Sequence, residues 1–307
     1  MKNKLHINPI LKKEMVVGSR SMKMSWTIMA VSGILTAIVV FILIITGFTV
    51  NYGGYSYQSL VVLFPVLGFA ECGLLSLMVP VITSGAISGE REKQTLDIML
   101  TTPISPFSIV MGKLWSAMMM VMMYMIASIP VMAIAFVLGG LSWWNLLGLF
   151  VMLLYLGIYV GSVGIFCSSL VKKSIAATIL TIVIGIGIIV GTVLIYFIGD
   201  AITRTYYLSS VNANIDYFSN SALIFLINPY SPLFDFMLRS LSDSSIYDIV
   251  VDSNAGAFMS VVYRFWIPIS MIINLLIAYG FLKLAAGRVN GKVKRKKVVV
   301  DNNTPNV

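Results

Sequence analysis

The sequence is poor in charged residues. Only 11% of its 307 residues are Asp, Glu, Lys or Arg, whereas a soluble domain is typically about one-quarter charged. Residues 24–69 contain none of these four types, and residues 115–171 contain none either. Water would not tolerate such runs on a protein surface, but lipid would. The composition therefore excludes an ordinary soluble protein and indicates an integral membrane protein.

Histidine and cysteine are also scarce. The only histidine, His6, lies in the charged N-terminal segment, and Cys72 and Cys167 each lie within a long apolar run. A histidine-based metal site or catalytic base inside a membrane bundle is therefore excluded. Two cysteines are too few for a cysteine-rich metal site or a disulfide framework, and we interpret both as small buried apolar side chains. We expect no cofactor and no metal on this chain.

The apolar runs are long enough to cross a membrane. A transmembrane helix needs about 20 mostly apolar residues, and the first candidate follows six basic residues and is too long for the apolar part of a signal peptide. We predict an all-α integral membrane protein whose transmembrane domain covers 26–286. Its six predicted spans are Trp26–Phe48, Leu60–Ser84, Gly112–Leu138, Leu146–Val171, Ile175–Ile198 and Phe258–Ala286.

The placement of basic residues predicts the orientation. If the N-terminus is cytoplasmic, 18 of the 21 Lys and Arg residues lie on the cytoplasmic side, as the positive-inside rule requires. We therefore predict N-in, C-in topology in a plasma membrane of bacterial type. The net charge of +9 follows from this bias, and a basic face interleaved with aromatic residues, typical of nucleic-acid binding, is absent.

Segments outside the spans carry further predictions. Residues 1–25 mix apolar and basic residues after Asn8 and Pro9, which predicts an amphipathic helix on the inner leaflet. Residues 287–307 form a basic cytoplasmic tail. Residues 199–257 form a long external loop with six Asp residues. Within it, Leu223–Ile227 is too short to span, and we expect a short helix that dips into the outer leaflet or covers the bundle.

The cytoplasmic segment between spans 2 and 3 is the most informative. Ser88 is suited to cap a helix, and acidic residues follow in the first turn, where the helix dipole favours them. Apolar residues then recur at helical spacing, and Pro103 disfavours helix at the residue before it. We predict a short cytoplasmic helix from Gly89 to Leu100, with an ordinary solvated connector as the alternative. Its candidate residues are Glu90, Arg91, Glu92, Leu96, Met99 and Leu100.

This segment resembles the cytoplasmic signature of type-2 ABC exporter permeases. The resemblance rests on residues 90–96 (EREKQTL), 100–105 (LTTPIS) and Gly112-Lys113, in that order. The chain has Gln94 where glycine is common in the family. The opening residues 8–14 are also similar to the start of many members. The resemblance implies a membrane subunit that dimerises with an identical or related permease and docks onto a separate ABC ATPase. It also implies that the N-terminal helix and the loop helix contact that ATPase, and that helices of the last external loop close the outer end of the pathway.

The chain carries no phosphate-binding loop of its own. Gly112-Lys113 and Gly291-Lys292 lack both the upstream glycine and the following Ser or Thr. We therefore expect no enzymatic activity on this chain, with ATP and Mg²⁺ bound and ATP hydrolysed on the partner.

Glu71 is the one carboxylate predicted within a span, where a charge costs about 2.5–3.5 kcal/mol on insertion scales. We interpret it as a pathway or interface residue; the alternative is a side chain that reaches a membrane surface. A stand-alone secondary transporter or channel, the alternative function, would require several such ionisable residues. A membrane enzyme would require a catalytic constellation, which the spans lack. The apolar bundle favours peptide, lipid-like or drug-like cargo.

Overall fold

The structure, a computed structural model, describes residues 22–50, 58–95, 105–139, 142–209, 220–242 and 257–302. Within these ranges the chain is helical and contains no β-strand. Six of the described helices are long and apolar enough to cross a membrane, which confirms the predicted all-α class and number of spans. The candidate spans are Met24–Thr46, Leu63–Glu92, Pro106–Leu138, Trp143–Leu170, Ser174–Thr203 and Trp266–Val289. The amphipathic helix predicted over 1–25 lies almost wholly outside the described residues.

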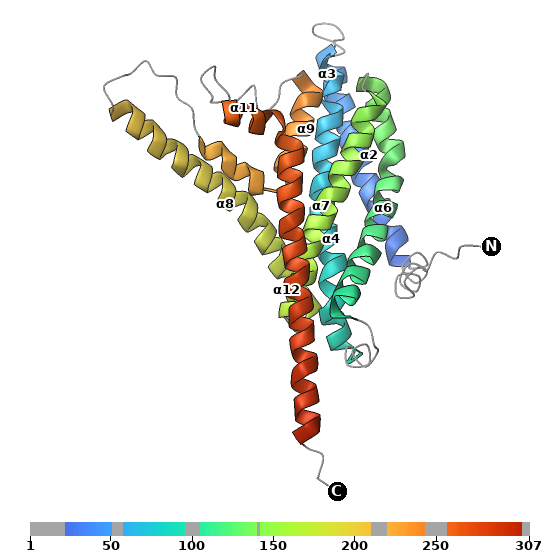
Figure 1. Cartoon of the computed structure of the whole chain (residues 1–307). Coiled ribbons are helices and arrows are strands. Elements are labelled where there is room, and N and C mark those ends of the chain that lie inside the picture. Colours follow the sequence, from blue (N-terminus) through green and yellow to red (C-terminus); the bar gives the residue numbers. More distant parts are fainter. Residues whose placement is uncertain are drawn as a thin grey trace, which may run out of the picture.

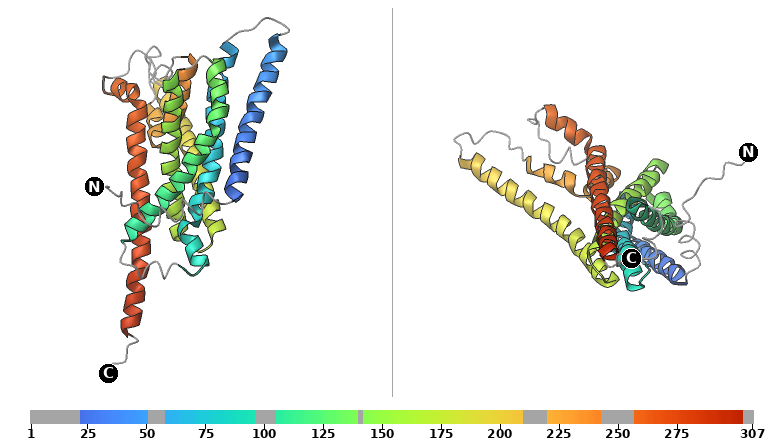
Figure 2. Two further views of the ribbon diagram at one scale, coloured as in Figure 1. Left: turned by 90° about the vertical axis from the view of Figure 1, so that its right-hand side faces the viewer. Right: turned by 60° about the horizontal axis from the view of Figure 1, so that its bottom comes forward.

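The spanning helices form one bundle in which each successive span runs opposite to the one before (Figure 1). The start of α2, the end of α4, the start of α6 and the end of α12 lie toward the same end of the bundle in two views (Figures 1 and 2). The six long helices are α2 (Met22–Val50), α4 (Leu63–Glu92), α6 (Pro106–Gly139), α7 (Trp143–Leu170), α8 (Ser174–Ser209) and α12 (Trp266–Asn302). Among the described residues, four short helices accompany them: α3 (Gln58–Val61), η1 (Asn220–Ile227), α9 (Ser231–Ser242) and α11 (Ala257–Arg264).

Helix α7 is the centre of the bundle. It packs against α4, α6, α8 and α12, and 16 of its 28 residues are buried. The contact with α4 depends on Gly164, where an added Cβ would overlap Oγ1 of Thr83. Small residues let helix backbones approach closely where no hydrophobic driving force exists between helices in lipid. Gly164 therefore sets the distance between α4 and α7.

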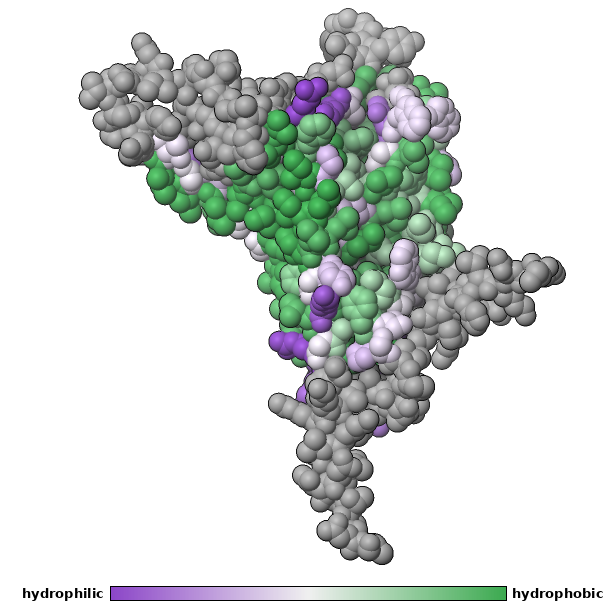
Figure 3. Space-filling view, viewed as in Figure 1, coloured by the Kyte–Doolittle hydropathy of each residue, from purple (hydrophilic) through white to green (hydrophobic). Residues whose placement is uncertain are grey.

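Helix α8 is the most peripheral long helix of the second half of the chain. Within its spanning segment only Ala177, Thr181 and Thr192 are buried, and it diverges from the rest of the bundle toward its C-terminal end (Figure 1). In the space-filling view, hydrophobic side chains cover the middle of the visible face, and hydrophilic ones gather toward its two ends (Figure 3). This distribution matches a bundle whose outer surface contacts lipid.

The segment from η1 to α9 is attached to the bundle by polar contacts. Asn228 donates from Nδ2 to Oγ1 of Thr192 on α8 at 2.8 Å, and Trp266 donates from Nε1 to Oγ of Ser231 at 2.8 Å. Asn274 on α12 donates to the carbonyl oxygen of Leu226 at 3.0 Å. These contacts hold the predicted external segment between α8 and α12, with the 223–227 stretch inside η1.

Element bounds differ from the sequence prediction at the last span. The segment predicted as one helix from Phe258 to Ala286 is divided into α11 and α12. Pro268, in the first turn of α12, has no N–H to donate to a carbonyl oxygen of α11, so the regular helical ladder is interrupted there. At its other end α12 continues to Asn302, through most of the segment expected as a separate tail.

Candidate functional site

The cytoplasmic helix predicted to begin after Ser88 does not begin there. Helix α4 runs without interruption from Leu63 to Glu92, and Ser88 lies inside it, donating its hydroxyl to the carbonyl oxygen of Ser84 at 2.6 Å. A serine hydroxyl inside a helix can bond one turn back instead of capping, which is the physical reason that this prediction was wrong. Of the predicted segment, 89–92 belong to α4, and Leu96, Met99 and Leu100 lie outside the described residues.

Helix α4 ends with an unusual backbone conformation. After Glu92 the chain makes a turn in which Gln94 has a φ of 57°. This left-handed conformation is common just after a helix end, where glycine adopts it without the steric cost that a Cβ adds. The departure noted in the sequence, Gln94 where glycine is common, therefore falls at the position where glycine has a conformational advantage.

The predicted residues Glu90, Arg91 and Glu92, hereafter the triplet, form the last turn of α4. Glu90 accepts a charged hydrogen bond from Nζ of Lys113 on α6 at 3.1 Å. A second Glu90 oxygen accepts a hydrogen bond from Oγ1 of Thr95. Glu90 therefore connects the end of α4 both to the turn that follows it and to α6.

Arg91 caps the C-terminal end of α7. Its Nη1 donates to the carbonyl oxygen of Val171 at 3.0 Å, and its Nη2 donates to that of Ser169 at 2.9 Å. The last carbonyl groups of a helix lack intrahelical partners and carry the negative end of its dipole. A planar guanidinium with separate N–H groups meets both needs at once, so Arg91 fixes α7 to α4.

Glu92 caps the N-terminal end of α8. One carboxylate oxygen accepts the backbone N–H of Ser174 at 3.1 Å, and the other accepts its hydroxyl at 2.8 Å. The first N–H groups of a helix lack intrahelical partners and carry a partial positive charge. Glu92 supplies to α8, from another helix, the acceptor that an N-cap side chain supplies locally.

Hydrogen bonds of serine and threonine hydroxyl groups extend these contacts into the bundle. The sequence did not lead us to predict them. Ser168 on α7 accepts the backbone N–H groups of Ile87 and Ser88, each at 2.9 Å. Ser84 on α4 shares a hydrogen bond with Thr178 on α8. The only sequence signal was a concentration of small polar residues after Cys167, which does not reveal its partners 80 residues earlier.

The second predicted site residue, Glu71, belongs to α4 and faces α6. It is 2% exposed within the single chain, and Ser128 on α6 donates a hydrogen bond to its Oε1. Its Oε2 has no hydrogen-bond partner among the described residues. Glu71 thus faces a neighbouring helix of the same chain rather than the outer surface of the bundle.

His, Cys, Asp and Glu residues are few in the part of the chain that the structure describes. No group of three or more His, Cys, Asp or Glu residues there could hold a metal ion. The site consists instead of helix ends joined by charged and polar contacts.

Comparison with known proteins identifies the family. A search of curated proteins gives no match to the chain. The family described as "ABC-2 family transporter protein" matches residues 58–275, a stretch that begins with α3 and includes α4, α6, α7, α8 and the first turns of α12. With six membrane-spanning helices and a family match over more than two-thirds of its length, the chain belongs to the ABC-2 transporter family and is a multi-pass membrane permease of the type-2 ABC class.

Proposed function

We propose that this chain is the permease subunit of an ATP-driven exporter, which forms the substrate pathway as a dimer and is driven by a separate ABC ATPase. The single observation that carries the proposal is the junction at the end of α4. There the triplet binds α6, the C-terminal end of α7 and the N-terminal end of α8. The last turn of α4, from which the next segment begins, is thereby joined to three other helices.

The arrangement explains how a displacement would spread. A push on residues 93–104 would reach α4 through Glu92 and α6 through Pro106, the two helices that this segment connects. Because Arg91 holds the end of α7 and Glu92 holds the start of α8, those two helices would move with α4. Charge-assisted hydrogen bonds are shorter and stronger than neutral ones, so a few of them suffice to keep the helix ends together.

The roles of the predicted site residues follow from this geometry. We propose that Glu90, Arg91 and Glu92 act in coupling as positioning residues, because each binds another helix of its own chain. Apolar contact with the ATPase is assigned to Leu96, Met99 and Leu100. An apolar group that enters a groove on a partner provides the type of anchor that carries much of the binding energy in an interface.

We further propose that Glu71 transmits movement between α4 and α6 within the membrane. Its hydrogen bond with Ser128 joins α4 to α6. The Glu90–Lys113 ion pair joins the same two helices at the end predicted to be cytoplasmic. The chain carries a carboxyl group at a position where an apolar residue would insert at lower cost, which supports a role beyond packing.

ATP and Mg²⁺ are assigned to the partner chain, because this sequence lacks the glycine-rich phosphate loop. The second permease is either an identical chain or a related one, and the complex is assigned to a plasma membrane of bacterial type. The surrounding lipid is the remaining partner, and nucleic acid has no role.

We expect a neighbouring gene to encode the ABC ATPase, and reconstitution of the chain with that ATPase tests the proposal. The expected result is that the two co-purify and that the permease changes ATP turnover. An informative variant replaces Leu96, Met99 and Leu100 together by serine. None of the three belongs to a described helix, and the variant is expected to abolish co-purification. Transport by the chain alone, driven by an ion gradient and indifferent to ATP, would instead support a stand-alone secondary transporter.

A further inference from the structure

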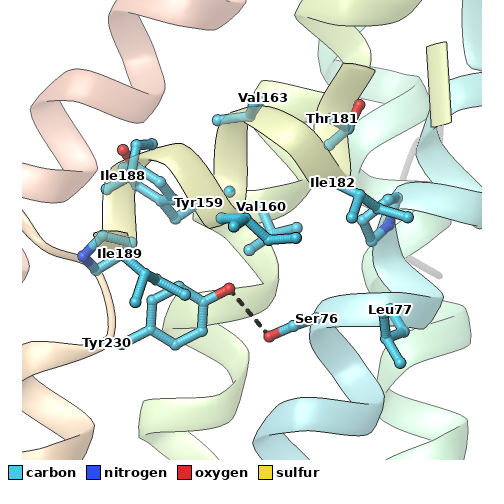
Figure 4. Close-up of a pocket in the computed structure, with 14 residues that line it drawn as sticks. Ser76, Leu77, Tyr159, Val160, Val163, Thr181, Ile182, Ile188, Ile189 and Tyr230 are labelled. Carbon is cyan, nitrogen blue, oxygen red and sulfur yellow. Dashed lines mark hydrogen bonds between the residues drawn. The ribbon is translucent and has the colours of Figure 1, made fainter. Parts of the chain in front are cut away.

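A cavity opens between α4, α7 and α8, in the middle part of the spanning helices. Its volume is about 120 Å³, and its lining comes mainly from these three helices, with Pro229 and Tyr230 at one end. Figure 4 shows its walls, with Tyr159 and Val160 of α7 opposite Leu77 of α4 and Ile188 of α8 nearby.

The cavity has a buried floor and an exposed rim. Tyr159 and Val163 on the floor are 3% exposed, whereas Leu77 and Ile186 on the rim are 57% and 56% exposed. The rim residues are apolar and belong to α4 and α8, the helices on either side of the opening. Since both helices span the membrane, the opening faces the hydrocarbon region rather than water.

The hydroxyl groups of Ser76, Thr181 and Tyr230 in the wall are already engaged within the chain. Tyr230 donates to Oγ of Ser76 at 3.1 Å, the bond drawn in Figure 4, and Ser76 donates in turn to the carbonyl oxygen of Cys72 at 2.7 Å. Thr181 donates to the carbonyl oxygen of Ala177 at 2.7 Å. The wall therefore offers a ligand mainly apolar contact, which disfavours sugars and ions because their polar groups would remain unpaired.

We propose that this cavity binds part of the acyl chain of a bilayer lipid. The ligand must enter from the hydrocarbon region, contact apolar walls and require no hydrogen bond, and an acyl chain meets all three conditions. The volume supports the assignment: drug-sized ligands occupy pockets of about 300–1,000 Å³, whereas an apolar cavity of about 150 Å³ accommodates a molecule as small as benzene. The site is independent of ATPase coupling, and it goes beyond the proposed function.

Gly185 provides a substitution that fills the cavity with little disturbance of the helix. It lies on α8 in the cavity lining, and an added Cβ would meet no atom within 4 Å. Gly187, two residues further along the same helix, also has no atom within 4 Å of an added Cβ, but it does not line the cavity. The same replacement by leucine at the two positions therefore separates cavity filling from any general effect on α8.

Photo-crosslinking tests the proposal. The purified chain is placed in nanodiscs that contain a phosphatidylglycerol with a diazirine on one acyl chain, irradiated, and analysed by mass spectrometry for adducts on 76–80, 159–163 and 181–189. The expected result is labelling of these peptides that falls about tenfold in G185L, the change expected when about two methylene groups lose their burial. G185A should give an intermediate loss, and G187L should label as the wild type does.

Folding is checked by helix content and thermal unfolding of each variant. Leucine has a higher helix propensity than glycine, so both leucine variants should unfold no earlier than the wild type. Equal loss of labelling in G185L and G187L, or labelling of the cavity peptides that persists in folded G185L, would overturn the proposal. Such a result would leave the proposed ATPase coupling untouched, because that is measured by co-purification.

Discussion

The carboxylate of Glu92, the last residue of α4, accepts both the backbone N–H and the hydroxyl of Ser174, the first residue of α8. The two residues are 82 positions apart in the chain. This contact places a negative charge at the positive end of a helix dipole. It also makes the start of α8 dependent on the position of α4.

The first prediction concerns this contact. E92A removes the acceptor for both hydrogen bonds, whereas S174A removes only the hydroxyl. We expect E92A to lower the melting temperature of the detergent-purified chain by more than S174A does. We also expect the double variant to be little worse than E92A, because the two residues share one interaction. Strict additivity in this double-mutant cycle would show that the two side chains act independently.

The second prediction concerns the packing of α4 on α7. G164A places a Cβ against Oγ1 of Thr83, whose hydroxyl is held by a 2.8 Å bond to the carbonyl oxygen of Val79. Overpacking of this kind costs about 1–3 kcal/mol, only partly offset by the gain of about 1 kcal/mol in helix propensity when alanine replaces glycine. The matched control is G187A, which has open space around the new methyl group. Unfolding in denaturant should rank G164A below G187A, and equal stabilities would show that α4 and α7 can separate without cost.

The sequence predicted the spans well because lipid imposes one dominant requirement. A long apolar run must form a helix to satisfy its backbone groups, so six runs became six helices. The break before Trp266 was missed although Pro268 was visible, since an apolar run with an internal proline remains compatible with one span. Pro80 and Pro130 show this, because each lies inside a continuous helix.

The site was predicted in part. The triplet was recognised as the charged element of its segment, but its partners were not. Arg91 binds carbonyl oxygens about 80 residues away, and no local pattern in the sequence encodes that pairing. Ser88 fitted the pattern of an N-cap, yet a continuous ladder of backbone hydrogen bonds from α4 competed with it. Local signals fail where a helix continues beyond its apolar segment without ending.

The third prediction concerns topology, which rests on the distribution of basic residues. In T95C the new thiol is expected to face the cytoplasm, and in S244C it is expected to face outward. A membrane-impermeant maleimide applied to intact cells should label S244C and spare T95C. The native Cys72 and Cys167 are both buried, so the unmodified chain serves as the background control. Labelling of T95C from outside would reverse the assigned orientation.

The fourth prediction concerns Glu71. E71Q keeps an oxygen that can accept the hydrogen bond from Ser128 and removes the capacity to carry charge. We expect normal insertion and an unchanged melting temperature, together with altered transport or altered stimulation of the ATPase. S128A is the control, because it removes the donor and leaves the carboxyl group in place. If E71Q matches the wild type in both transport and ATPase stimulation, Glu71 is only tolerated at this depth.

The last prediction separates two roles for Glu90. If it binds Lys113 within its own chain, E90K places two positive charges where the ion pair of 3.1 Å stood and should weaken both stability and ATPase coupling. Exchanging the two charges, in E90K/K113E, should restore coupling, because the pair is re-formed in the opposite sense. If Glu90 instead contacts the ATPase, the exchange leaves the wrong charge facing the partner, and like charges at an interface oppose association.

Co-purification with the ATPase and permease-dependent ATP turnover are measured for the single variants and for the exchange. Membrane expression should be unaffected by E90K, since added positive charge on the cytoplasmic side obeys the same bias that orients the chain. Recovery in E90K/K113E would assign Glu90 to the junction of α4 and α6, and failure to recover in a stable, well-expressed protein would assign it to the partner surface.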